Sequence, residues 1–336
     1  MWPLKSEGCF DDRPARDVRR ADQSVPPRTR TAGEGRAALC CLGSVGAATM
    51  TSLSPLTRRG LALLRCPICS LDLTAAGGSL KCRNRHSFDI ARTGYVNLLG
   101  GRRRLPGAGG DRAVQLRHRA AFLDAGHFDC IAAMIARQAR QLSAAVGNCW
   151  RVLDAGCGTG HHLGRVAATL QAPVVGLGLD ISSEAARHAA RRWPDLAFAT
   201  ADVWRPWPVR DAVADLVMSV FAPKNFPETA RVLRPGGLLA MAYPGPNHLS
   251  ELRARFGLMR QHEAKADRYL EAAAKHVGSP ITARLVRRTM LGLAGVRDVI
   301  LMGPNALGVT RAALEIDAQS LRVTFDVVML FAHKQH

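Results

Sequence analysis

Residues 150–160, WRVLDAGCGTG, decide the fold. The apolar run has the length and the aliphatic side chains of a buried strand, and the glycines after it allow a tight turn and a close approach of a ligand to the backbone. A dinucleotide-binding loop has the spacing G-x-G-x-x-G, whereas Gly156, Gly158 and Gly160 give G-x-G-x-G, with Asp154 before them. The spacing therefore argues against a nicotinamide dinucleotide.

Short apolar runs that alternate with helical patterns follow this loop along the chain. Their length and aliphatic content are typical of buried strands, at residues 174–180, 196–202, 214–220 and 237–243. A further run at 320–330 is typical of a closing strand. Strands that alternate with helices favour an α/β fold with a doubly wound, mostly parallel sheet. Ahead of the loop, the apolar spacing over 113–147 predicts two helices that separate near Gly126.

Acidic residues stand at the ends of the second and third predicted strands. A carboxylate at Asp180 can accept two hydrogen bonds from ribose hydroxyls, and one at Asp202 can accept a hydrogen bond from an adenine amino group. With the glycine loop and the LRPGG turn at 233–237, these acids resemble the class I S-adenosylmethionine-dependent methyltransferases, whose sheet is Rossmann-like. The resemblance implies S-adenosylmethionine as cofactor. The alternative is a glycine loop that serves only as a tight turn between a strand and a helix.

Three cysteines and a histidine have the spacing of a metal site. Cys66 and Cys69 form one close pair, and Cys82 and His86 form a second pair after twelve intervening residues. Because each pair lets one turn of backbone present two ligands to the same ion, we expect a closed, tetrahedral, structural Zn²⁺ site. The residues between the pairs predict a hairpin with a Gly-Gly tip. Scattered buried cysteines are the alternative.

The composition restricts the class of partner. Lys and Arg number 46 against 27 acidic residues, which gives a formal net charge of +19. This excess suits a polyanion such as nucleic acid, although arginine enrichment by a GC-rich genome explains the same charge. No apolar run approaches the roughly 20 residues that span a bilayer, and the N-terminus lacks the apolar core of an export signal. We therefore expect a cytoplasmic protein without membrane association.

The chain is expected to divide into four segments. We expect residues 1–60 to be a disordered extension, because 1–49 are rich in Arg, Pro, Gly and Ser and lack any helical or strand period. A start codon assigned too far upstream of Met50 is the alternative explanation for the extension. The other segments are a zinc-binding RNA-recognition module at 64–98, a linker and helices at 99–147, and a methyltransferase domain at 148–336.

Beyond these separate motifs, the chain resembles one family from residue 64 to its end. The segments that carry the resemblance are CPIC, KCRNRHSFDIARTGYVNLL, FLDAGHF, LDAGCGTGHHL, LDIS, FAPKN, LRPGG and PGPNHLSEL. They are similar to those of the RlmA family of 23S ribosomal RNA guanine-N1 methyltransferases. The segments GHHL, ADVW and VFAPKN are more similar to its Gram-positive, macrolide-resistance branch, which modifies guanine 748 in hairpin 35. The resemblance thus implies that target, and the 745-position enzymes of the same family are the alternative.

The resemblance also implies roles for individual residues. The four metal-ligand candidates match the family's zinc ligands, Gly158 and Thr159 match its cofactor loop, and His248 matches a further cofactor contact. Phe128 replaces the common Tyr of a segment that meets the cofactor, so ring packing can persist without the hydroxyl's hydrogen bond. The cofactor-binding candidates are Phe128, Asp154, Gly156, Gly158, Thr159, Gly160, Asp180, Asp202 and His248.

The reaction needs the proton on guanine N1 to leave, and positioning of the reactants is expected to contribute most of the rate. The segment FAPKN follows the fourth predicted strand, at the sheet edge where ligands bind in such folds. Its carbonyls and Asn225 are candidates to hold the base edge, and Phe221 is a candidate to stack a flipped guanine, with core packing as its alternative. The segment contains no carboxylate, and Glu228 is the nearest one downstream. No general base is assigned.

Two further functions are consistent with parts of the sequence. A zinc RNA-binding protein with a non-catalytic methyltransferase fold would explain the metal site and the charge, but the intact glycines and acids favour an enzyme. A small-molecule methyltransferase would explain neither the metal site nor the charge. The expected partner is hairpin 35 of 23S ribosomal RNA, and the arginines at 83, 85, 92 and 102–104 are expected to bind its phosphates. Whether the protein is a homodimer, and whether it confers resistance, is left open.

Overall fold

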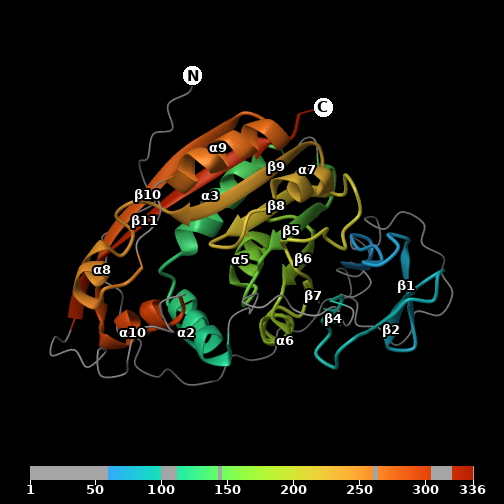
Figure 1. Ribbon diagram of the computed structural model, residues 1–336, viewed down its shortest axis with the longest axis horizontal. Helices are drawn as coiled ribbons and strands as arrows, with labels where there is room; N and C mark the ends of the chain where they lie inside the picture. Colours follow the sequence, from blue (N-terminus) through green and yellow to red (C-terminus); the bar gives the residue numbers. More distant parts are fainter. Residues whose placement is uncertain (1–59, 100–111, 143–145, 260–263, 304–319, 336) are drawn as a thin grey trace.

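The computed structural model describes residues 60–99, 112–142, 146–259, 264–303 and 320–335 (Figure 1). The expectations for nearly all of the 1–60 extension and for the linker arginines 102–104 lie outside the described residues.

Within these residues, the largest element is an eight-stranded sheet in the order β10-β11-β9-β8-β5-β6-β7-β4. The strands from β9 to β4 run parallel to their neighbours, and β11 runs antiparallel to both β9 and β10. The sheet strands are β4 (Val96–Asn97), β5 (Trp150–Ala155), β6 (Val174–Asp180), β7 (Ala197–Thr200), β8 (Ala214–Val220), β9 (Leu233–Pro244), β10 (Pro280–Gly292) and β11 (Ser320–His333). The predicted doubly wound α/β sheet is confirmed.

The predicted strands agree with this sheet except at its two edges. β6 and β8 have the predicted bounds, and β9 begins four residues earlier than the apolar run at 237–243. β10 was not expected, because as an edge strand it is half exposed and its Arg and Thr residues interrupt the apolar alternation. β4 was not expected either, since two residues are too few to give a periodic signal.

Helices cover both faces of the sheet. Alternate residues of β9 point to opposite faces, so Leu238 and Ala240 join one core cluster while Leu239 and Met241 join the other. Helices α3, α5, α6 and α10 pack on the first face, and α7, α9 and the zinc module pack on the second. The helices are α2 (Ala113–Asp124), α3 (Asp129–Arg140), α5 (His161–Thr169), α6 (Ser183–Arg192), α7 (Phe226–Val232), α8 (Ser250–Phe256), α9 (Ala264–His276) and α10 (Leu293–Leu301).

The zinc module is a small three-stranded antiparallel sheet of β1 (Leu73–Ala76), β2 (Ser79–Cys82) and β3 (Ser87–Asp89). Gly77 and Gly78 form the tip of the β1–β2 hairpin at φ 54° and 78°. Two successive positive φ values define the two-residue turn that matches the twist of a hairpin, which is why glycines occupy both positions. The predicted hairpin is confirmed.

The module is joined to the methyltransferase domain by backbone pairing. β4 adds a parallel strand to the β7 edge of the main sheet, as Figure 1 shows at one end of the molecule. Leu64 forms a β-bridge with Val209, and the Arg65 N–H donates to Pro208 O at 3.0 Å. Leu63 and Leu80 belong to the same apolar cluster as Trp207. The module therefore packs as a part of the sheet's second layer.

A domain boundary was expected at residue 148, but residues on both sides of it belong to one apolar core. Ile131 and Ile135 of α3 are fully buried and lie in the cluster that contains Val152 of β5 and Leu163 of α5. Apolar spacing predicts that a helix has a buried face, but it carries no information about which domain buries it. The two predicted helices thus belong to the same domain as the glycine loop, because α2 and α3 share its core.

Candidate active site and metal centre

The glycine loop is shaped by backbone conformations that side chains rarely adopt. Gly156, Gly158 and Gly160 have φ values of 82°, 53° and 71°. A Cβ on Gly156 would lie 2.5 Å from the Cβ of Ala222, and one on Gly160 would lie 2.9 Å from the ring of Phe198. All three glycines are therefore required by their conformation, and Gly156 is required also by the close approach of the chain that follows β8.

A cavity of about 690 Å³ opens at this loop, at the carboxyl ends of the parallel strands. Ligand sites in open α/β sheets lie at this edge. Among the predicted site residues, its walls contain Phe128, Asp154, Gly156, Gly158, Thr159, Phe221 and His248. The predicted residues outside its walls are Gly160, Asp180, Asp202 and Asn225.

The environment of Asp154 indicates which charge a ligand in the cavity should carry. Its side chain is 2% exposed, and its Oδ1 atom has no hydrogen-bond partner among the described residues. Burial, reinforced by the charge of Asp180, raises the pKa of Asp154 to about 7. A buried carboxylate oxygen without a partner is costly, and a positively charged ligand that supplies a donor would remove that cost. S-adenosylmethionine, which carries an ammonium group and a sulfonium, has this chemistry.

Asp180 and Asp202 lie at the carboxyl ends of β6 and β7, beside the cavity. Asp180 Oδ2 accepts from the Gly158 N–H at 2.8 Å, and Oδ1 accepts from the Ser182 N–H at 2.8 Å. Asp202 Oδ1 accepts from the Trp204 N–H at 3.0 Å. Asp180 thus helps to hold the glycine loop itself, a task that the sequence did not indicate. Carboxylates have further lone pairs, so both positions remain compatible with ribose and adenine contacts.

Aromatic rings form another part of the cavity wall. The Phe128 ring lies 5.2 Å from that of Phe221 and 6.2 Å from that of His248, measured between centroids. His248 Nδ1 lies 2.9 Å from the carbonyl oxygen of Asp326 and 3.3 Å from its backbone N, so β11 fixes the orientation of the imidazole ring. Burial lowers the pKa of His248 to about 4, and its imidazole is neutral at pH 7. Phe221 has φ 50°, an unusual conformation for a bulky residue.

Lys224 is a cavity residue that the sequence reasoning missed. Its Nζ donates to the backbone O of Ser219 at 2.8 Å and to the Ser219 hydroxyl at 3.1 Å, which closes the turn that contains Phe221. Burial lowers the pKa of Lys224 to about 7, while the nearby charge of Asp154 opposes this shift. The signal that could have found it is a lysine inside the segment FAPKN, since a lysine beside a buried strand end needs acceptors or a counter-charge.

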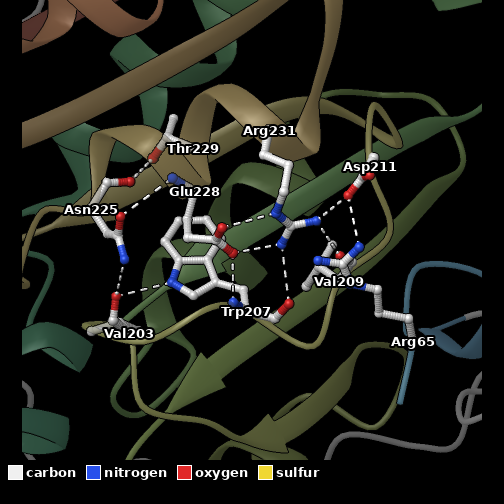
Figure 2. A network of polar contacts seen from close by, with 9 residues as sticks. All are labelled: Arg65, Val203, Trp207, Val209, Asp211, Asn225, Glu228, Thr229 and Arg231. Carbon is white, nitrogen blue, oxygen red and sulfur yellow. Dashed lines mark hydrogen bonds and ion pairs between the residues drawn. The ribbon is translucent and has the colours of Figure 1, made fainter. Parts of the chain in front are cut away.

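The structure gives Asn225 a task that conflicts with its predicted contact to the substrate base. It is the N-cap of α7: its Oδ1 accepts from the Glu228 N–H at 3.3 Å, and its Nδ2 donates to Val203 O at 3.0 Å (Figure 2). Both ends of the amide are therefore occupied, and Asn225 does not line the cavity. An Asn followed three residues later by Glu is a helix-start signal, and it was available in the sequence.

Asn225 is part of a polar network that reaches the zinc module. Figure 2 shows Glu228 and Arg231 of α7 with Asp211 and Arg65. Arg231 forms two hydrogen bonds with the Glu228 carboxylate and also contacts Asp211, whose other partner, Arg65 Nη1, lies 2.9 Å away. Because Arg65 directly precedes the first metal-ligand candidate, this network joins the module to the helix after the FAPKN segment.

The four metal-ligand candidates converge. The ligand atoms of Cys66, Cys69, Cys82 and His86 all lie within 4.8 Å of one another. Cys69 Sγ is 3.6 Å from Cys82 Sγ, and Cys66 Sγ is 3.5 Å from His86 Nδ1. A tetrahedron with Zn–S bonds of about 2.3 Å has edges of about 3.8 Å, so the residues fit zinc. Four protein ligands complete the coordination shell, which makes the ion structural.

A buried histidine in the cavity wall predicts acid sensitivity. Burial, with His161 adding repulsion, lowers the pKa of His162 to about 3, well below its ordinary value of 6.5. The unfolded state therefore binds the extra proton first, and the stability contribution is complete above pH 6.5 and declines as the pH falls toward 3. We expect His162→Gln to remove about 1.4 kcal/mol of this decline per pH unit over that range.

Denaturant unfolding of cofactor-free protein at several pH values measures this difference. Titration of the metal ligands is common to both proteins and cancels when the variant is subtracted from the wild type. The exposed His333→Gln serves as control. Parallel pH curves for wild type and His162→Gln would contradict the assignment of a buried neutral imidazole.

Comparisons with known proteins agree with this geometry. Residues 64–103 match the model described as RlmA, N-terminal, a zinc ribbon, and residues 152–237 match a methyltransferase domain. The chain is 41% identical over 244 residues to the 23S rRNA (guanine(748)-N(1))-methyltransferase of Streptomyces fradiae, covering 72% of this chain and 85% of the relative. It belongs to the RlmA family of methyltransferases.

Two other relatives also match over most of this chain. A provisionally named 23S rRNA (guanine-N(1)-)-methyltransferase of Micromonospora griseorubida is 40% identical over 72% of this chain and 86% of its own length. A provisionally named protein of the same description from Bacillus subtilis is 31% identical over 81% of this chain and 97% of its own length. This RlmA-family methyltransferase thus uses S-adenosylmethionine and carries a zinc ribbon. No helix among the described residues is long and apolar enough to cross a membrane.

Proposed function

We propose that this protein transfers the methyl group of S-adenosylmethionine to N1 of a guanine in hairpin 35 of 23S ribosomal RNA, at position 748. The observation that carries the proposal is 41% identity, over 85% of its length, to a relative named for that reaction. The cavity at the glycine loop and the complete Cys₃His cluster agree with it. The 745-position reaction is the alternative, and we further propose macrolide resistance of the tylosin type as a consequence of the modification.

The chain's own residues act by binding and positioning. The cofactor, when bound, supplies a methyl group that is attached to a sulfonium, and the sulfonium sulfur is a good leaving group. The glycine loop, Asp154 and Asp180 hold the cofactor, and the conformation of Phe221 presents its ring, 38% exposed, at the cavity where the target base enters. The Lys224 contacts fix that conformation. Among the described residues Asp154 is the single carboxylate that lines the cavity, and it is assigned to the cofactor, so proton loss from N1 is assigned to no side chain.

Primer extension across hairpin 35 tests the proposal. A methyl group on N1 blocks the base-pairing edge of guanine, so reverse transcription stops one nucleotide before a modified base. We expect a stop at 748 on RNA incubated with wild-type protein and cofactor. A stop at 745 would select the alternative position, and RNA binding without any stop would select a non-catalytic RNA-binding protein.

RNA binding is expected to use the exposed arginines of the zinc module. Arg83, Arg85 and Arg92 are exposed, and none forms an ion pair within the described residues. Each phosphate that an arginine neutralises releases counterions, so the slope of log affinity against log salt becomes less steep by about 0.7 to 0.9 per lost contact. We expect the triple Arg→Glu variant to bind a hairpin 35 fragment at least 100-fold more weakly, with a shallower salt slope.

Filter binding at several salt concentrations measures this change, and calorimetry with S-adenosylmethionine should show unchanged cofactor affinity. A matched variant with Arg102, Arg103 and Arg104 replaced by Glu tests the linker arginines. If neither triple variant loses RNA affinity, the zinc module is not an RNA-recognition element, even where methylation persists.

A further inference from the structure

The order of the strands places the target base relative to the cofactor, and this step rests on the proposed function. The ribose and adenine candidates, Asp180 and Asp202, lie at the carboxyl ends of β6 and β7, on one side of the glycine loop after β5. On the other side of that loop the sheet continues with β8 and β9. A cofactor whose adenosine lies over β6 and β7 directs its methyl end toward β8 and β9. The base that accepts the methyl group must therefore lie over the ends of these two strands.

The cavity extends to this side and is lined there by two tyrosines. Phe221 directly follows β8, Tyr243 is the penultimate residue of the neighbouring β9, and the Phe221 N–H donates to the backbone O of Ala242 at 3.0 Å. Tyr269 of α9 also lines the cavity, with its ring centroid 5.2 Å from that of Tyr243 at an interplanar angle of 71°. Phe226 of α7 lies 6.2 Å from the Tyr269 ring.

The tyrosine hydroxyls are available for a ligand. In the described part of the chain, neither the Tyr243 nor the Tyr269 hydroxyl makes a hydrogen bond, although Tyr243 is 7% exposed and Tyr269 is half-buried. Burial raises the pKa of both phenols, so each remains protonated and can donate. Neither hydroxyl oxygen is among the fully buried polar atoms that lack a partner, so both remain accessible to a ligand in the cavity, and a guanine edge offers the O6 and N7 acceptors and the N2 donor.

A lysine lies at the same wall of the cavity as Tyr269. Lys265, in the first turn of α9, is exposed and lines the cavity together with Tyr269 one helical turn later. Helix α9 packs against α7, β10 and β11, which fixes the position of the helix that carries both residues (Figure 1). An ammonium at the edge of a base pocket is suited to the phosphate that flanks an extruded nucleotide.

We propose that Tyr243 and Tyr269 form the part of the cavity that recognises the target guanine by its edge, and that Lys265 binds the phosphate beside it. Recognition by paired polar groups selects strongly, because a base that lacks the matching atoms would bury these hydroxyls without giving them partners. The site thereby distinguishes guanine from other bases that could enter the same aromatic cavity. Phe221 contributes stacking, which does not depend on the identity of the base.

Steady-state methylation of a hairpin 35 fragment by Tyr243→Phe and Tyr269→Phe tests the proposal, since each change removes only an oxygen. We expect kcat/KM for RNA to fall about 10-fold for each variant, with the Kd for S-adenosylmethionine and the Tm unchanged. Tyr95→Phe, at the third tyrosine of the chain and outside the cavity, is the matched control and should retain wild-type activity. Lys265→Met should raise the KM for RNA about 5-fold, whereas Lys275→Met near the end of the same helix should not.

Three results overturn the inference in distinguishable ways. If wild-type protein methylates the fragment and both Tyr→Phe variants retain kcat/KM within 2-fold, the inference fails and the proposed function stands. If either variant loses cofactor affinity by the same factor as kcat/KM, the tyrosines belong to the cofactor site. If wild-type protein leaves guanine N1 unmethylated in primer extension, the proposed function fails and this inference fails with it.

Discussion

Replacing Cys82 by serine is expected to unfold the zinc module and to destabilise the methyltransferase domain with it. The module contains three short strands and no separate core, because its leucines share an apolar cluster with Trp207. A segment of this size folds only with additional stabilisation, and structural zinc sites in small peptides contribute about 10–16 kcal/mol at neutral pH. Cys82 is buried at the end of β2 and provides one of the four ligands.

The loss of stability should extend from the zinc module to the main sheet. Once the module opens, β4 no longer pairs with β7, and Leu64 no longer bridges to Val209. We expect about one zinc per wild-type chain by atomic absorption, little zinc in Cys82→Ser, and a lower Tm for the variant or for chelated wild type. Cys149→Ser, which lies outside the cluster, should behave as wild type. Wild-type protein without zinc, together with an unchanged Tm for Cys82→Ser, would falsify the assignment.

Replacing Gly156 by alanine is expected to abolish cofactor binding. The new Cβ would lie 2.5 Å from that of Ala222, and the residue would have to keep φ near 82°. The contact is with a short side chain next to Pro223, so the clash can be relieved only by moving the glycine loop or the turn after β8. The left-handed conformation alone costs about 1–2 kcal/mol for a residue other than glycine. Both segments that move form walls of the cavity.

Gly147 provides a control that separates strain from the clash. It has φ 71°, and a Cβ there would meet nothing within 4 Å. Gly147→Ala should therefore lose about 1–2 kcal/mol of stability and keep the wild-type Kd for S-adenosylmethionine. Calorimetry should detect no cofactor binding by Gly156→Ala. If Gly156→Ala bound S-adenosylmethionine as well as Gly147→Ala does, the approach to Ala222 would not be needed for cofactor binding.

The parts of the site that could be predicted are those whose conformation depends only on residues that are neighbours in the chain. Gly156, Gly158 and Gly160 indicate a turn wherever they occur after an apolar run, and Cys66 and Cys69 can face one ion only across a single turn of backbone. These patterns fix a conformation over a few residues, so they hold in any tertiary context. The buried strands β6 and β8 were predictable for the same reason, since continuous aliphatic runs are buried wherever the sheet places them.

The roles that the sequence did not indicate depend on partners far away in the sequence. Asn225 reads equally well as a ligand contact or a helix cap, and the carbonyl of Val203, twenty-two residues away, decides for the cap. The role of Lys224 in closing the turn after β8 follows from its acceptors at Ser219 and from the charge of Asp154, seventy residues earlier. A polar side chain has several possible partners, and the free energy of burial selects among them only once the chain is folded.

The sequence by itself determined the α/β fold, the glycine loop and the ligands of the metal site, because each is encoded in residues that are neighbours in the chain. Only the tertiary structure decided that the zinc module extends the sheet through β4, that α2 and α3 belong to the methyltransferase domain, and that Tyr269 of α9 faces the same cavity as Tyr243. Contacts of this kind join segments that are distant in sequence, and such pairs form where packing and hydrogen bonding bring the surfaces together. Periodicity can predict that a surface is buried, but the folded chain alone determines what buries it.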